Sequence, residues 1–145
     1  MRGRCATTEV APYWIAQIIG ALAAAFVARF LVGQPANPAM VPAVGPALVA
    51  EFLFTFALVY VVLNTATAKA TAGNSYYGLA IGMTVMAGAF SAGSVSGGAF
   101  NPAVAIGAST MGLIAPTSIW IHIGGEMAGG ALAALAFKYI NPEDK

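Results

Sequence analysis

The sequence predicts an all-α membrane protein with four membrane-spanning helices and one half-length helix, and three observations lead to this prediction. Of its 145 residues, 59% are hydrophobic and only 8% are charged, whereas a soluble domain carries about 25% charged residues. Four apolar segments are long enough to cross a hydrocarbon core of about 30 Å. A fifth apolar run is half that length and follows a glycine-rich stretch, which indicates a re-entrant loop.

The four expected spans cover residues 13–32, 47–65, 76–92 and 116–139 of a single transmembrane domain, 1–145. An even number of crossings places both termini on one side of the membrane. Five of the six Lys and Arg residues fall on that side, and only Arg29 falls on the other. Because positive charge is retained in the cytoplasm, we expect a multi-pass cell-membrane protein with cytoplasmic termini.

The fifth element, a re-entrant loop and half-helix, is expected at residues 93–111. Asn101 is a good N-cap residue, and Pro102 suits the first helical position. The helix that follows would be about 10 residues and about 15 Å long. Irregular backbone persists at membrane depth only where protein or a water-filled cavity satisfies it. We therefore expect a pore, with Asn101 at the positive tip of the half-helix.

Two stretches carry a family resemblance. Ser96-Gly-Gly-Ala-Phe-Asn-Pro-Ala-Val-Ala-Ile-Gly107 resembles the second Asn-Pro-Ala (NPA) loop of the aquaporin, or major intrinsic protein (MIP), family. Glu51-Phe-Leu-Phe-Thr-Phe56 resembles the signature that opens each repeat of that family. The resemblance implies an aquaporin-like fold from the third span onward, with the first two spans and the first half-helix absent. It also implies a homotetrameric, passive channel for water and small neutral solutes such as glycerol, urea or peroxide.

The resemblance assigns roles to individual residues. It places Asn101, Pro102 and Ala103 at the pore, a selectivity filter at Ala89, Gly98 and Val104, and lining carbonyl groups at Gly97, Gly98, Ala99 and Phe100. Val104 stands where most members have arginine, and Ala89 stands where strict water channels have histidine. This departure predicts a wide, uncharged filter.

The apolar spans contain the ionisable residues Glu51, His122 and Glu126. Glu51 is a functional candidate by its position, and the resemblance implies that it braces the backbone of the re-entrant loop; a proton relay is the alternative. His122 and Glu126 are four residues apart and share a helix face. They supply too few ligands for a metal site, so we expect packing or interface residues, and no metal or other cofactor.

Other interpretations of the sequence stay open at this point. The chain could be a fragment of a secondary transporter, because broken helices and repeats occur there too, or a non-conducting truncated membrane protein. An enzyme is not expected, since no nucleophile–base pair, metal set or phosphate loop is recognisable, and no basic cluster points to nucleic acid. A second triplet, Asn37-Pro38-Ala39, lies in a proline-rich loop that cannot continue as a helix, and we interpret it as a chance match.

Overall fold

A computed structural model describes residue 3 and residues 5–144, and its regular elements are helices. They are α1 (Thr7–Val32), α2 (Val44–Val62) with a terminal π-helical turn (Leu63–Thr67), a 3-10 turn (Lys69–Thr71), α3 (Tyr77–Ser96), α4 (Pro102–Met111), a 3-10 turn (Pro116–Ser118) and α5 (Ile119–Ile140). Four of the helices are long and apolar enough to cross a membrane, whereas α4 has only 10 residues. The prediction of an all-α membrane protein with four spans and one half-helix is confirmed.

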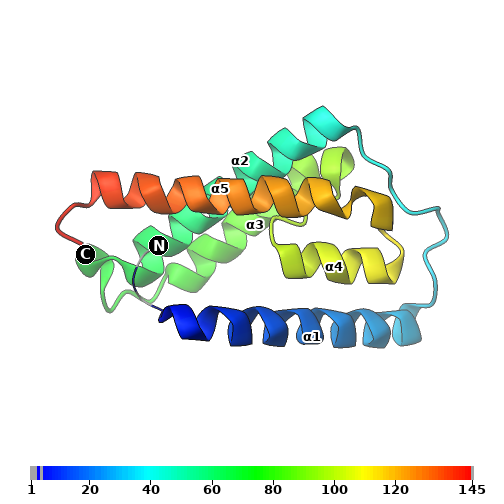
Figure 1. Cartoon of the computed structure of the whole chain (residues 1–145), viewed down its shortest axis with the longest axis horizontal. Helices are drawn as coiled ribbons and strands as arrows, with labels where there is room; N and C mark the ends of the chain where they lie inside the picture. The colour runs from blue at the N-terminus through cyan, green and yellow to red at the C-terminus, as the bar shows by residue number, and fades with distance from the viewer. Residues whose placement is uncertain (1–2, 4, 145) are drawn as a thin grey trace.

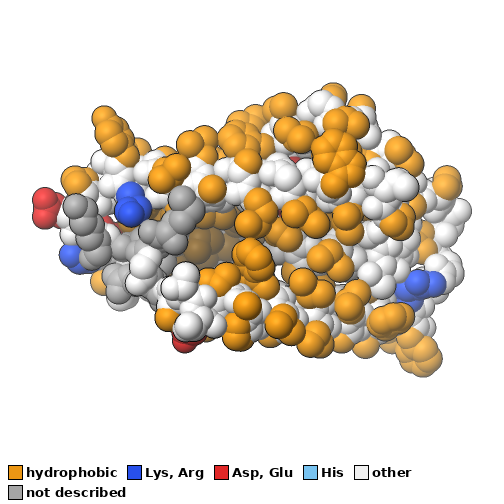
Figure 2. All heavy atoms as spheres, in the orientation of Figure 1, with side chains coloured by type: hydrophobic (Ala, Val, Ile, Leu, Met, Phe, Trp, Pro, Cys, Tyr) orange, Lys and Arg blue, Asp and Glu red, His pale blue; other side chains and the backbone are white. Residues whose placement is uncertain are grey.

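The short helix α4 lies between α1 and α5, while α2, which packs against both α5 and α3, passes behind α5 together with α3 in this view (Figure 1). Gly107 lets α4 approach the Ala21 carbonyl oxygen of α1 closely. Figure 2 shows that hydrophobic side chains cover most of one face and that charged side chains gather at its two ends. This distribution suits a protein whose middle is surrounded by lipid.

Helices α2 and α5 cross at unusually close range because glycine occupies the contact. A Cβ atom at Gly129 would collide with the Phe52 carbonyl oxygen, and one at Gly125 would lie 3.0 Å from the Leu48 carbonyl oxygen. Small residues allow such backbone contact between membrane helices. The crossing brings the buried side chain of Glu51 against α5.

Several boundaries differ from the sequence-based expectation, and two differ by four residues or more. Helix α1 begins at Thr7 instead of residue 13, and α3 continues to Ser96 instead of ending near residue 92. The end of α3 is set by Gly97, which takes a left-handed conformation (φ 96°) and donates its N–H to the Gly93 carbonyl oxygen. Glycine at this position is the usual way to end a helix, so the irregular backbone is confined to residues 97–101.

The close crossing predicts that Gly129→Ala destabilises the protein, because the added methyl group has no room against the α2 backbone. Overpacking of this kind costs about 1–3 kcal/mol. Gly124→Ala is the matched control, since a Cβ there meets nothing within 4 Å. Thermal unfolding of both variants in detergent checks the prediction, and equal midpoints for the two would contradict it.

Candidate functional site

The candidate site is the irregular segment of residues 97–101 together with the tip of α4. Phe100 takes a left-handed backbone conformation (φ 52°), which is uncommon for a non-glycine residue and costs about 1–3 kcal/mol. Its ring is buried and packs 5.2 Å, centroid to centroid, from the Phe54 ring. Gly88 makes room for it, because a Cβ there would lie 2.6 Å from the Phe100 ring. Packing and hydrogen bonds together therefore hold this strained turn.

The Glu51 carboxylate is fully buried and accepts hydrogen bonds from the segment. Its Oε1 accepts from the Ser96 hydroxyl at 2.6 Å and from the Ala99 N–H at 3.1 Å. Its Oε2 accepts from the Phe100 N–H at 2.7 Å. Hydrogen bonds to an ionised acceptor are about twice as strong as neutral ones. These are the contacts that a brace for the loop requires.

Asn101 caps α4 with its own side chain. Its Oδ1 accepts the Ala103 N–H at 2.9 Å, which leaves the side-chain amide N–H groups for other partners, and Pro102 occupies the first turn. At the opposite end of α4, the Arg29 guanidinium donates to the Thr110 carbonyl oxygen at 3.0 Å. A cation at the negative end of a helix dipole is favourable, so Arg29 compensates the C-terminal end of the half-helix while the N-terminal end keeps its positive potential.

The structure brings two of the three expected filter positions together. A Cβ atom on Gly98 would lie 3.5 Å from the Ala89 Cα atom, and the Ala89 side chain is exposed. The third position, Val104, is on α4 and 51% exposed. Within the described part of the chain, no donor is hydrogen-bonded to the carbonyl oxygens of the four expected lining residues, Gly97, Gly98, Ala99 and Phe100.

His122 and Glu126 lie buried behind the re-entrant segment, where α5 packs against α2, and this burial fits the expectation of packing residues. The His122 side chain is fully buried, with Nε2 2.7 Å from the Ser96 carbonyl oxygen and 3.8 Å from Glu51 Oε1. The Glu126 carboxyl group is buried on the next turn of α5. The sequence held a signal for this placement, because both residues are ionisable and lie on the apolar span that carries Gly125 and Gly129.

The Asn37 triplet does not begin a helix, as expected from its prolines. Asn37 is exposed in the loop between α1 and α2, and the next helix begins only at Val44. This loop is tied to the segment after α4, because Met40 accepts the Ala115 N–H and donates to the Leu113 carbonyl oxygen, both at 2.9 Å.

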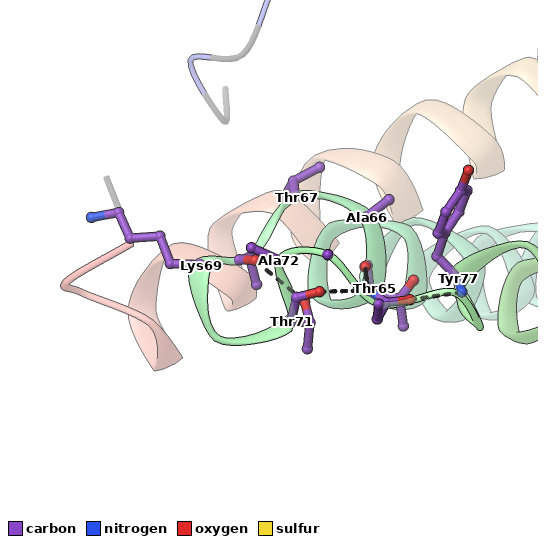
Figure 3. A pocket seen from close by; sticks show the side chains of 10 residues that line it. Thr65, Ala66, Thr67, Lys69, Thr71, Ala72 and Tyr77 are labelled. Atoms are coloured by element: carbon purple, nitrogen blue, oxygen red, sulfur yellow. Dashed lines mark hydrogen bonds between the residues drawn. The ribbon is translucent and has the colours of Figure 1, made fainter.

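A cavity of about 590 Å³ lies at the turn between α2 and α3, away from the candidate site. Figure 3 shows Thr65, Thr71 and Tyr77 around it. Its polar groups are largely hydrogen-bonded within the turn, for example the Thr71 hydroxyl to the Asn64 carbonyl oxygen at 2.6 Å. Among the residues that the structure describes, no group of three His, Cys, Asp or Glu side chains could hold a metal ion.

Comparison with known proteins agrees with this geometry. The family described as Major intrinsic protein matches residues 1–137. Aquaporin NIP1-4 of Oryza sativa subsp. japonica is 37% identical over 144 residues, which cover 95% of this chain and 51% of the relative. Aquaporin TIP2-1 of Arabidopsis thaliana is 38% identical over 131 residues, which cover 86% of this chain and 52% of the relative.

The chain spans about half the length of these curated relatives. Within that half, the match extends across α1 to α5 and includes the half-helix with Asn101 at its tip. The chain belongs to the major intrinsic protein family.

Proposed function

We propose that the native protein containing this sequence is a passive membrane channel for water and small neutral solutes. The observation that carries the proposal is the placement of Asn101 at the N-terminus of α4, with its Oδ1 engaged in the cap. Its amide N–H groups can then donate to a permeant. Membership of a channel family, with relatives named aquaporins, supports the same conclusion and argues against an enzyme.

Ion exclusion follows from the direction of α4 in this proposal. The positive end of the helix dipole repels cations, while a neutral molecule exchanges its bulk hydrogen bonds for protein groups. The Asn101 amide supplies donors. The carbonyl oxygens of residues 97–100 supply acceptors, in keeping with their lack of donors among the described residues.

The filter is proposed to be wide and uncharged. Ala89, Gly98 and Val104 carry small, apolar side chains or none, so they add neither a positive charge nor much bulk. Solutes of the glycerol, urea or peroxide class would pass together with water. Without an arginine at position 104, cation exclusion would depend more on the tip of α4.

Topology and assembly are also proposed. The described helices would form one multi-pass domain of the cell membrane, with the termini in the cytoplasm according to the distribution of Lys and Arg. Four copies would assemble as a homotetramer, with one pore for each subunit.

Stopped-flow light scattering of vesicles that contain the native protein tests the channel. An osmotic gradient should collapse faster than in empty vesicles, and the rate should not depend on a sodium or proton gradient. A rate that follows an ion gradient would instead favour a coupled transporter. The buried, ionisable Glu51–His122 pair is the feature that favours this alternative. A rate equal to that of empty vesicles would favour a non-conducting membrane protein.

Glu51→Gln should destabilise the site, because an amide nitrogen would replace one of two oxygens that face N–H and O–H donors. Buried hydrogen bonds to a charged group contribute about 1.5–3 kcal/mol each, so we expect a lower unfolding midpoint and slower water flux. Glu9→Gln is the matched control: Glu9 lies at the exposed start of α1, where glutamine can also cap. If both variants behave like the unmodified protein, Glu51 is not a brace.

Val104→Arg should close the proposed wide filter to larger solutes. We expect glycerol flux to fall by at least about tenfold, which corresponds to an added barrier of about 1.4 kcal/mol, while water flux changes less. Val104→Ala is the control and should leave glycerol flux unchanged. An unmodified protein that passes water but leaves a glycerol gradient standing would show that the filter is narrow.

A further inference from the structure

The Glu126 carboxyl group is a feature of the site that the proposed channel does not use. Its side chain is 2% exposed on α5, and among the described residues neither oxygen has a hydrogen-bond partner. The neighbouring Gly125 lies against Glu51, since a Cβ there would be 3.2 Å from the Glu51 Cβ atom, and α4, with Asn101 at its N-terminus, contacts α5. Buried polar groups are almost always hydrogen-bonded, so this carboxyl group requires an explanation.

The surrounding charges leave Glu126 without a counter-ion. Glu51 on α2 receives three donors from the loop. His122 on α5 is occupied elsewhere, with Nε2 2.7 Å from the Ser96 carbonyl oxygen and Nδ1 3.2 Å from the Ser118 carbonyl oxygen. The loop and α4 contribute no ionisable side chain between residues 97 and 111. Arg29 contacts the opposite end of α4, about 15 Å from its tip.

An ionised Glu126 would therefore be a second buried negative charge beside Glu51, with only a neutral donor, the Asn101 N–H, near it among the described residues. Such a charge is strongly unfavourable, and a buried group normally loses it by binding a proton. A protonated carboxyl group is a hydrogen-bond donor as well as an acceptor. A proton on Glu126 would remove the repulsion and would provide the missing bond to Glu51.

The hydrogen-bonding capacity of Glu51 fits this arrangement. A carboxylate has about four acceptor positions. Oε1 of Glu51 accepts two bonds, whereas Oε2 accepts one, from Phe100, among the described residues. Oε2 of Glu51 can therefore accept the O–H of the Glu126 carboxyl group. The C=O oxygen of the same carboxyl group would remain to accept from the next backbone N–H.

That next donor is the Asn101 N–H. Glu51 binds the N–H groups of Ala99 and Phe100, while no acceptor for the N–H of Asn101 occurs among the backbone hydrogen bonds of the described residues. We propose that Glu126 is a positioning residue for Asn101: it carries a proton, donates it in a hydrogen bond to Glu51 Oε2, and accepts the Asn101 N–H. Two carboxyl groups on two helices would then hold three consecutive N–H groups of the re-entrant segment.

Infrared spectroscopy of the native protein that contains this sequence tests the proton directly. The unmodified protein should show a protonated-carboxyl C=O band that shifts in D₂O, and Glu126→Gln should remove it from the difference spectrum. Glu9→Gln, at the exposed start of α1, should leave it in place. If no such band is present, or if Glu126→Gln leaves it unchanged, Glu126 is ionised and the proposal is wrong.

Water flux tests the positioning role, which rests on the proposed channel function. Glu126→Gln should conduct normally, because its amide can donate to Glu51 and accept from Asn101. Glu126→Leu fills similar space but makes neither hydrogen bond. Its water flux should fall by roughly tenfold, because losing one buried hydrogen bond raises a barrier by about 1.4 kcal/mol. Equal flux for both variants would overturn the positioning role. If the unmodified protein conducts nothing, the channel proposal fails, whereas the infrared band still decides whether Glu126 carries a proton.

Discussion

A backbone that enters the membrane without regular structure needs hydrogen-bond partners inside the protein, and here the Glu51 carboxylate supplies them. Residues 98–100 can neither continue α3 nor begin α4, because Gly97, Gly98 and Phe100 are in left-handed conformations. Lipid offers neither donors nor acceptors, so each unsatisfied group would cost several kcal/mol. Two N–H groups and one hydroxyl of this region converge on one buried side chain. The position of the α4 tip depends on that convergence.

The brace in turn depends on how closely two helices approach. Gly125 and Gly129 allow the α5 backbone to contact α2. A Cβ atom at Gly125 would lie 3.2 Å from the Glu51 Cβ atom. This contact seals Glu51 from the surroundings and places His122 against the end of α3 through Ser96. Glycine therefore acts twice here, first in packing the helices and second, at Gly97, in ending α3 where the irregular segment must begin.

Much of this organisation could be predicted from the sequence because it depends on local patterns. Apolar length predicts the four spans, and an asparagine followed by proline predicts the start of α4 at the observed residue. Glu51 could be singled out because a charge in an apolar span is costly. The end of α3 was harder to predict, since four further residues, Gly93-Ser-Val-Ser96, continue the helix although glycine and serine are common in loops.

The surroundings of His122 and Glu126 could not be predicted from local patterns. Spacing of four residues places them on one face of α5, but spacing does not tell which neighbour that face meets. Only the α2–α5 crossing shows that this face contacts the loop and Glu51. Glu51 precedes His122 by about seventy residues in the chain. Glu51 therefore has an ionisable neighbour that is distant in sequence, since His122 Nε2 lies 3.8 Å from its Oε1 atom.

The electrostatics of the half-helix follow from the same arrangement. Val104 carries no charge, so in the proposed channel the positive potential near the pore would come from the N-terminus of α4 itself. Arg29 compensates the other end of this dipole by binding the Thr110 carbonyl oxygen. Negative charge on the buried carboxyl groups behind the loop would oppose this positive potential, so in the proposed channel one such charge would reduce cation exclusion less than two. In the proposed channel, a neutral Glu126 would hold Asn101 in place without reducing the potential that repels cations.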